Sequence, residues 1–343
     1  PLDRWLNEAV FPEEAKLKER DIYNGTLAGC AEMLKYGTVS CNDMYFSGKA
    51  MADAYIDAGM KANISLAVTC FNGETEFKKL PVYDEYERLA EYLQDNKKVC
   101  FDYSTHAEYT NTEKSIAGVV ERAAFHKTGL HIHMSETQKE HEGCVGRHGL
   151  TPAAFFDRLG VFGLRTIAAH CVWCDDDDYA LMGEKGVYMA SCPTSNLKLG
   201  SGIPDYKRAR ESNVRICLGT DGVASNNNLN MVKEAKLMAL LAKGKNLDPS
   251  LCKAGEALRA ATRTAWLSQG RERSGLIKEG FDADLTVYSI NTVNTMKARD
   301  GADTLVYACD GEAYMTMCGG EILYKNGEYY TIDKENLVYE IGK

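Results

Sequence analysis

Residues 129–137 read GLHIHMSET, a stretch that combines a strand pattern with groups that can bind metal or carry protons. Apolar and polar residues alternate through its first part, so His131 and His133 point to the same side of a strand. The apolar pattern stops at Glu136, where a long polar segment begins. In enzymes built on parallel strands the chemistry lies where the strands end. We therefore interpret His133 as a metal ligand and Glu136 as the proton shuttle beside it; the alternative is a hydrogen-bonded structural histidine and a solvated glutamate.

Outward from this strand, short continuous apolar runs alternate with helical patterns through most of the chain. The runs that we predict as strands are 39–45, 64–70, 98–104, 129–136, 165–172, 186–192 and 214–221. Alternation of this kind predicts an α/β fold with a parallel sheet covered by helices. Seven units are one fewer than a (β/α)8 barrel of the TIM type needs, so we predict such a barrel with its first strand ahead of Pro1. A doubly wound open sheet competes, but no glycine-rich phosphate loop follows any strand.

The two ends of the chain differ from this central pattern. Residues 3–10 are predicted as a short helix that breaks near Pro12, and residues 13–36 as a longer helix. Because the chain begins with Pro1 and not with Met, we expect that an N-terminal portion precedes it. From about residue 273, short β runs with tight-hairpin signals at 319–320 (GG) and 326–327 (NG) replace the alternation. We predict a barrel over 1–272 and the C-terminal part of a β-sandwich module over 273–343.

Composition bounds the class of protein. The 343 residues are 45% hydrophobic, enough for a large core, and carry a formal net charge of −9. No basic cluster is present, so nucleic acid and anionic membranes are not expected as partners. No apolar run approaches the roughly 20 residues that cross a bilayer. A small-molecule substrate is the expected partner, and a homo-oligomer stays open.

Cysteine usage points to a reducing compartment. The twelve cysteines are scattered, and several, such as Cys70 and Cys100, lie in apolar strand-like runs. This usage favours buried thiols in a cytoplasmic enzyme over a disulfide framework. Cys171 and Cys174 match a C-x-x-C spacing, but no second pair completes a structural metal site. A redox or zinc role for that pair is therefore the less favoured interpretation.

Three predicted strands end in groups that can bind metal or move protons. His133 and Glu136 end the fourth strand, His170 ends the fifth and Asp221 the seventh, while His106 follows the third. One such group at a strand end is usually structural, but their recurrence is less expected by chance. Because the ends of parallel strands meet at one edge, we expect a common site. The remaining histidines, interpreted as structural or solvated, are His126, His131, His141 and His148.

Longer motifs carry a family resemblance. HIHMSE (131–136), AAHC (168–171) and LGTDGVASNNNLNM (218–231) resemble the amidohydrolase superfamily. More closely, the chain is similar to deaminases of S-adenosylhomocysteine, 5′-methylthioadenosine and adenosine-like nucleosides. The segments SCPTSNLKLGSGI (191–203) and IKEGFDADL (277–285), with DRWLNEAVFPEEAKL near the start, extend the resemblance over essentially the whole chain. The family fold is a βα barrel with a β-sandwich split between its two ends, which fits the β module.

The resemblance implies a centre with one divalent metal, Zn²⁺ first and Fe²⁺ as the alternative. His133 and Asp221 are expected ligands, Glu136 is expected to handle protons, and His170 to orient or polarise the attacked group. The family also carries a His-x-His pair of ligands on its first strand, which we expect upstream of Pro1. Residues 1–343 alone are therefore expected to bind metal poorly, because catalytic zinc sites usually keep three protein ligands.

The resemblance also implies substrate contacts. Glu14 matches a carboxylate that holds the ribose diol, with Trp5 packing nearby. His106 matches a contact to the purine ring, and Ser225 lies on the substrate side of the metal aspartate. The family arginines that hold the amino-acid carboxylate of S-adenosylhomocysteine have no match, since the corresponding segment 65–77 contains no Arg.

These residue types suit hydrolytic deamination. A bound divalent cation lowers the pKa of water from ~15.7 to about 7, and a carboxylate such as Glu136 takes a proton from water and passes it on. We therefore expect deamination of an adenosine-like nucleoside (adenosine, 5′-deoxyadenosine, 5′-methylthioadenosine or S-adenosylhomocysteine) to the inosine analogue and ammonia. The alternatives are an amidohydrolase acting on guanine, cytosine or a triazine, and a non-catalytic relative without its metal. Glu14 discriminates, because a diol-binding carboxylate is useful only if a ribose is present.

Overall fold

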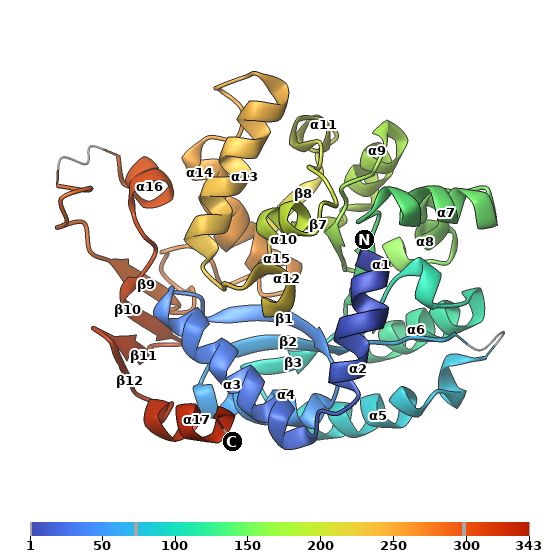
Figure 1. Cartoon of the computed structure of the whole chain (residues 1–343), viewed down its shortest axis with the longest axis horizontal. Coiled ribbons are helices and arrows are strands. Elements are labelled where there is room, and N and C mark those ends of the chain that lie inside the picture. The colour runs from blue at the N-terminus through green and yellow to red at the C-terminus, as the bar shows by residue number, and fades with distance from the viewer. Residues whose placement is uncertain (1, 72–74, 297–299, 343) are drawn as a thin grey trace.

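Parallel strands in sequence order form the central layer of the molecule (Figure 1). The computed structural model describes residues 2–71, 75–296 and 300–342. The strands of the layer are β1 (Ser40–Tyr45), β2 (Lys61–Leu66), β3 (Val99–Phe101), β4 (Tyr103–Thr105), β5 (Leu130–Met134), β6 (Thr166–His170), β7 (Tyr188–Ser191) and β8 (Arg215–Leu218). β1 to β3 pair as one parallel sheet and β4 to β8 as a second.

One residue, Asp102, joins the two sheets. The Asp102 amide donates to the carbonyl of Ile64 in β2 at 2.9 Å, and the Tyr103 amide donates to the carbonyl of Gly129, just before β5, at 3.0 Å. The chain thus changes partners without leaving the layer. The seven predicted strands and their parallel order are confirmed, with the third strand split into β3 and β4. Within the described residues β1 and β8 are the ends of the layer, so closure into an eight-fold barrel stays a prediction.

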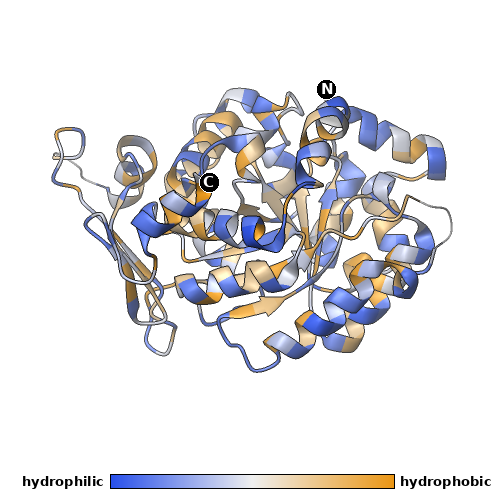
Figure 2. Ribbon diagram, turned by 60° about the horizontal axis from the view of Figure 1, so that its bottom comes forward, coloured by the Kyte–Doolittle hydropathy of each residue, from blue (hydrophilic) through white to orange (hydrophobic). Residues whose placement is uncertain are grey.

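Helices surround the strands and turn hydrophilic residues outward (Figures 1 and 2). Those that follow the strands are α4 (Gly48–Ala58), α5 (Pro81–Leu93), α6 (Glu113–His126), α7 (Gln138–His148), α8 (Pro152–Arg158), α9 (Asp176–Lys185), α10 (Pro193–Lys198), α11 (Tyr206–Glu211), α12 (Val223–Asn226), α13 (Met231–Asn246), α14 (Ala254–Arg259) and α15 (Ala265–Ser268). Among the described helices, none has the length and apolar character needed to cross a bilayer.

The helical start of the chain differs from its prediction. α1 (Leu2–Trp5), a π-helical turn (Leu6–Val10) and α2 (Phe11–Glu14) follow one another directly, so the break predicted near Pro12 is wrong. Proline lacks an N–H, but this is tolerated in the first turn of a helix, where Pro12 lies. The chain leaves the helix only after Glu14, and α3 (Glu19–Lys35) begins later than predicted.

The alternation read from GLHIHMSET is present in the folded strand. Leu130, Ile132 and Met134 are fully buried in the main apolar core. His131 and His133 lie between them on the opposite side of β5 and are less buried. The strand therefore gives one face to the core and the other to polar side chains.

A small antiparallel sheet forms the C-terminal module. Its strands are β9 (Leu285–Tyr288), β10 (Ala313–Cys318), β11 (Glu321–Lys325) and β12 (Glu328–Tyr329), in the order β12-β11-β10-β9, with α16 (Gly301–Asp303) and α17 (Lys334–Ile341) beside it. Residues 319–320 and 326–327 have φ between +51° and +88°, the left-handed values that two-residue hairpins need. Both predicted hairpin turns are confirmed. The domain boundary near residue 273 stays a prediction.

Candidate active site

The ends of β5 and β6 bring three predicted catalytic groups together. The rings of His133 and His170 lie face to face, with centroids 5.6 Å apart and planes at 22°. Glu136 follows β5, and its Oε2 lies 3.8 Å from Nε2 of His170. His106, which follows β4, lies on the other side, with its ring centroid 4.9 Å from that of His133. These groups, which lie in or just after different strands in the sequence, are therefore close to one another in the folded chain.

Hydrogen bonds to the inner ring nitrogens fix both imidazoles. Nδ1 of His133 lies 2.7 Å from the carbonyl oxygen of His106, which can only accept, so this nitrogen carries the proton. Nδ1 of His170 lies 2.8 Å from Oδ1 of Asn196. In each ring, Nε2 therefore points away from the oxygen that is bonded to Nδ1. For His133 this leaves an unprotonated nitrogen of the kind that binds metal.

Asp221 follows β8 and is held from two sides. The Ser195 hydroxyl donates to Oδ2 at 2.6 Å, and the Gly222 amide donates to Oδ1 at 2.7 Å. Burial opposes ionisation of Asp221, but the charge of His170 and the Ser195 bond outweigh it, so its pKa lies below the usual value. The carboxylate is therefore ionised and oriented.

Left-handed backbone conformations gather at the same edge. Ser135, His170, Cys171 and Asp221 have φ of +50°, +73°, +50° and +62°. Non-glycine residues rarely adopt such values, which cost free energy. Each of these residues lies at the end of a strand or just after it, where the backbone turns and directs side chains over the edge of the layer.

Glu140, on α7, supports the loop that carries Glu136. Its carboxylate accepts from the amides of Ser135 (2.9 Å) and Glu136 (2.8 Å). Burial raises the pKa of Glu140 to about 7. The sequence interpretation missed this residue, although a glutamate at the third position of a helix that directly follows a catalytic loop is a readable signal.

A second support reaches Glu136 from the segment after α10. The Ser201 hydroxyl donates to Oε1 of Glu136 at 3.3 Å. Trp173 links the two segments, because its amide donates to the Ser135 carbonyl (2.9 Å) and its indole N–H to the Ser201 carbonyl (2.8 Å). Glu136 itself is only 8% exposed. The Glu136 carboxylate is therefore buried, and hydrogen bonds from neighbouring segments hold the loop that carries it.

Burial keeps most of the histidines at this edge neutral. It lowers the pKa of His106 and of His131 to about 3 in each case, assisted by the neighbouring His133. Burial and the charge of His170 also lower the pKa of His133. Burial opposes protonation of His170 as well, but Glu136 and Asp221 raise its pKa above the usual value. His131, interpreted from sequence as structural, shares the site's face and lies 3.3 Å through Nδ1 from the Ser65 hydroxyl.

The remaining residues predicted to contact substrate, beyond His106 and Glu136, lie in two places. Oε1 of Glu14, at the end of α2, accepts from the Tyr45 hydroxyl at the end of β1 (2.8 Å). Trp5 lies nine residues earlier on the same helical segment, roughly 13 Å along its axis, so direct packing on Glu14 stays a prediction. The Ser225 hydroxyl donates to the Gly222 carbonyl at 3.0 Å, beside Asp221. Residues 72–74, part of the segment without arginine, lie outside the described residues.

The turn into α10 holds supporting residues that sequence reasoning did not assign. Ser195 bonds Asp221, and the next residue, Asn196, bonds His170. Glu234 of α13 accepts from the Thr194 amide (3.0 Å) and from the Asn226 side chain (2.9 Å), which ties this turn to the segment after Asp221. The PTSN motif (193–196) lies in the segment 191–203 that carries the resemblance. Its spacing did not predict that Ser195 and Asn196 bond Asp221 and His170.

Another polar cluster is accounted for by helix capping. Ligand atoms of His141, Asp175 and Asp178 lie within 4.8 Å of one another. Asp175 and Asp178 accept each other's amides at the start of α9, and Thr151 donates to Asp178 at 2.5 Å. These bonds explain the cluster without a metal.

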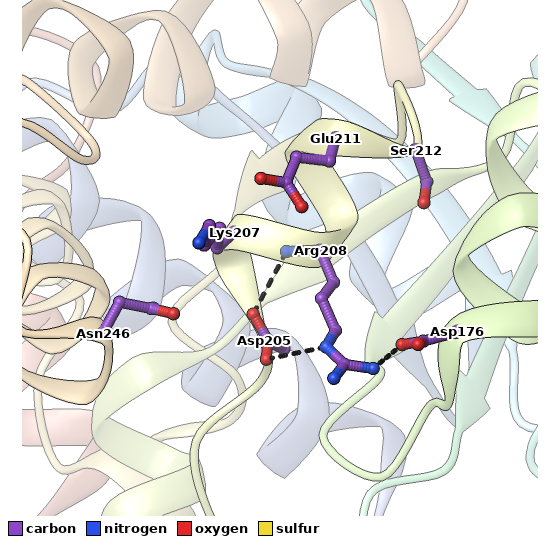
Figure 3. A pocket seen from close by; sticks show the side chains of 7 residues that line it. All are labelled: Asp176, Asp205, Lys207, Arg208, Glu211, Ser212 and Asn246. Atoms are coloured by element: carbon purple, nitrogen blue, oxygen red, sulfur yellow. Dashed lines mark hydrogen bonds and ion pairs between the residues drawn. The ribbon is translucent and has the colours of Figure 1, made fainter.

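A surface groove of about 610 Å³ opens beside α9 and α11 (Figure 3). It is lined by Asp176, Asp205, Lys207, Arg208, Glu211, Ser212 and Asn246. Arg208 forms ion pairs with Asp176 and Asp205 (3.5 Å for the latter). The groove mixes both charge signs and contains none of the predicted site residues.

Comparison with protein families decides the class. The model of the amidohydrolase family matches residues 1–323. The chain belongs to the amidohydrolase family. The prediction of a hydrolase acting on a C–N bond is thereby confirmed at the level of the family.

Individual relatives are nucleoside deaminases by name. The chain is 38% identical over 344 residues to 5-methylthioadenosine/S-adenosylhomocysteine deaminase of Dictyoglomus thermophilum, covering 100% of this chain and 80% of the relative. It is 34% identical to 5′-deoxyadenosine deaminase of Methanocaldococcus jannaschii, covering 99% and 81%. The crystal structure of an adenosine deaminase from Xanthomonas campestris with bound zinc superimposes with a TM-score of 0.93 at 30% identity, covering 100% of this chain and 79% of that one.

Proposed function

We propose that this protein hydrolyses the amino group of an adenosine-like nucleoside, with one divalent cation, Zn²⁺ first, to give the inosine analogue and ammonia. The observation that carries the proposal is the meeting of a bare imidazole nitrogen, an ionised aspartate and a buried glutamate at one edge of the layer. The named activities of the relatives point to the same substrate class.

The donor atoms suit a divalent cation. His133 keeps its Nε2 free because Nδ1 is bonded to a carbonyl, and Asp221 is ionised. Neutral imidazole and carboxylate are the ligand types that zinc takes in catalytic sites. His133 and Asp221 are the residues that would hold the cation, which when bound supplies a water of lowered pKa.

Glu136 is the group that moves protons in this proposal. It accepts one proton from the attacking water and passes it to the ring nitrogen, then accepts the second proton from the added hydroxyl and passes it to the departing amine, as a positioned carboxylate can. Burial and the Ser201 bond keep its carboxylate in one place. His170, with Nε2 toward Glu136, orients the attacked group.

The remaining predicted residues define the substrate class. Glu14 binds the ribose diol, Trp5 packs nearby, His106 contacts the purine ring, and Ser225 lies on the substrate side of Asp221. Segment 65–77 offers no arginine to a substrate carboxylate, and an unpaired buried carboxylate is costly. Nucleosides without an amino-acid tail are therefore preferred over S-adenosylhomocysteine.

The test is a panel of adenine nucleosides, with guanine, cytosine and a triazine as rival substrates, assayed for ammonia release. The protein is expressed from its complete reading frame and loaded with Zn²⁺. Turnover of adenosine, 5′-deoxyadenosine or 5′-methylthioadenosine is expected, with poor turnover of the rivals. Preference for a ring without ribose would favour the second enzyme interpretation, and no turnover at all would favour a non-catalytic relative.

A further inference from the structure

A hydrogen bond between a tyrosine and a glutamate joins the N-terminal helical segment to the strand layer. Tyr45 is the last residue of β1, and its hydroxyl donates to Oε1 of Glu14 at 2.8 Å. Figure 1 shows α2 close to the end of β1. Glu14 is the last residue of α2, directly before the chain leaves the helix. The bond thus joins a terminal helix to the edge that carries the candidate site.

Tyr45 is fixed by more contacts than Glu14. Tyr45 lies in the parallel ladder opposite Leu66, and its carbonyl accepts from the Ala67 amide at 3.0 Å. Its ring also packs against Phe46, with centroids 5.0 Å apart. Among the described residues, the carboxylate of Glu14 is held by the Tyr45 hydroxyl, and its backbone belongs to a short helical segment. Tyr45 is therefore the fixed partner, and Glu14 is the one that is oriented.

The carboxylate of Glu14 has unused capacity. Each carboxylate oxygen has two lone pairs, so the group accepts about four hydrogen bonds. Within the described part of the chain, the Tyr45 hydroxyl is the one group that donates to it. Burial and the bond to Glu14 raise the pKa of Tyr45, so it stays protonated and donates. Oε2 and one lone pair of Oε1 remain for a ligand with two hydroxyls.

We propose that Tyr45 is a positioning residue that holds Glu14 ready for the vicinal diol of a ribose. This inference rests on the proposed function and adds to it a residue that selects nucleosides. A carboxylate that is oriented before binding loses less side-chain freedom when the diol arrives. The diol bond forms equally in the ground state and the transition state, so Tyr45 acts on KM and leaves kcat almost unchanged.

The experiment compares Tyr45→Phe with wild type on two substrates, adenosine and 2′,3′-dideoxyadenosine. Loss of one hydroxyl that contacts a charged group is expected to raise KM for adenosine about ten-fold. KM for the dideoxy compound, which has no diol, should not change. In a Glu14→Ala background the Tyr45→Phe change should have no further effect on either substrate.

Tyr92→Phe is the matched control, since the Tyr92 hydroxyl donates to Asp53 at 2.6 Å in a pair on the outer surface. It should leave KM for both substrates unchanged. An equal rise in KM for adenosine and for the dideoxy compound with Tyr45→Phe would show a general structural role and overturn the inference. An unchanged KM for adenosine would also overturn it. Wild type that deaminates neither compound would instead contradict the proposed function.

Discussion

The two ends of the same strand layer bury charged groups in opposite ways. At the amino end, Nζ of Lys61 lies 2.8 Å from Asp282 and 2.7 Å from Asp284. Asp102 is likewise paired there with Arg165 at 2.5 Å. At the carboxyl end, ring contacts join His106, His131 and His170 to His133, and His106 and His131 are neutral because burial and the neighbouring rings lower their pKa.

This difference separates stability from chemistry. A buried charge that already touches its counter-charge has no remaining capacity for a ligand, whereas a bare ring nitrogen beside an ionised aspartate does. Lys61 joins β2 to the segment before β9, so its pairs fasten the C-terminal module to the layer. We expect substitutions at the amino end to change the free energy of unfolding, and those at the carboxyl end to change turnover.

The largest expected effect is that of Glu136→Gln on turnover. Glutamine keeps the size and polarity of the side chain but cannot carry the proton, so kcat should fall by ~10²–10⁴. Bound metal, measured by elemental analysis, should stay at the wild-type level. Glu142→Gln, on the exposed side of α7, is the control and should keep full activity. Loss of metal together with activity would make Glu136 a ligand.

Lys61→Met should have the converse effect. The Lys61 side chain is 6% exposed and that of Asp284 1%, so the change leaves a buried carboxylate without its partner. Breaking a buried pair costs about 3–5 kcal/mol, and because Asp282 is 38% exposed we expect about 3 kcal/mol. Denaturant unfolding measures this, while kcat of the folded enzyme should be unchanged.

The exposed pair of Lys49 and Asp53 provides the control for Lys61. Lys49→Met should cost no more than about 0.5 kcal/mol, because exposed ion pairs contribute little. Equal losses for the two lysines would remove the distinction between buried and exposed pairs. A kcat that falls with Lys61→Met would remove the separation between the two ends of the layer.

Glu140 gives a pH-dependent test at the carboxyl end. Burial raises its pKa from 4.5 to about 7, so the folded state holds this proton more tightly than the unfolded chain does. Its protonated form stabilises the fold below pH about 4.5, and that contribution is lost as the pH rises through about 7. The stability of wild type relative to Glu140→Gln should therefore fall by on the order of 3 kcal/mol over this window.

Urea unfolding of both proteins across that pH range measures the difference. Glu142→Gln again provides the control, because an exposed glutamate on the same helix should add no such slope. A constant stability difference between wild type and Glu140→Gln would mean that Glu140 ionises as readily in the folded state as in the unfolded chain.

Most of the fold could be predicted from the sequence because the patterns that specify its strands and turns are local. Continuous apolar runs between helical patterns predicted the strands of the layer, the third of which is split in two, and the GG at 319–320 and NG at 326–327 predicted two hairpins. The error at Pro12 has a local cause too, since proline reads as a helix breaker unless its place in the first turn is known. The partner change at Asp102 was not readable, because both halves look like one strand.

The sequence predicted site residues only where the residue type itself can bind metal or carry a proton. Histidines and acids at strand ends predicted His133, Glu136, His170 and Asp221 as neighbours. The supporting residues Ser195, Asn196 and Glu140 were not predicted, because each acts through one hydrogen bond set by the tertiary fold. A serine or asparagine in a turn has many possible partners, and only the folded structure selects one.

The smallest expected effect among these is that of Glu14→Ala on substrate choice. Two neighbouring glutamates allow a matched comparison: Glu13 is paired with Lys16 at 2.6 Å on the surface, whereas the carboxylate of Glu14 accepts only from the Tyr45 hydroxyl among the described residues. Losing a charge-assisted bond to a ribose hydroxyl costs about 1.5–3 kcal/mol, so kcat/KM for adenosine and 5′-methylthioadenosine should fall roughly ten- to a hundred-fold. Free adenine should be a poor substrate for wild type and variant alike, and Glu13→Ala should match wild type. An unchanged kcat/KM in Glu14→Ala would refute the ribose assignment. An equal loss of kcat/KM on free adenine would mean that Glu14 supports the carboxyl edge of the strand layer and does not recognise the sugar.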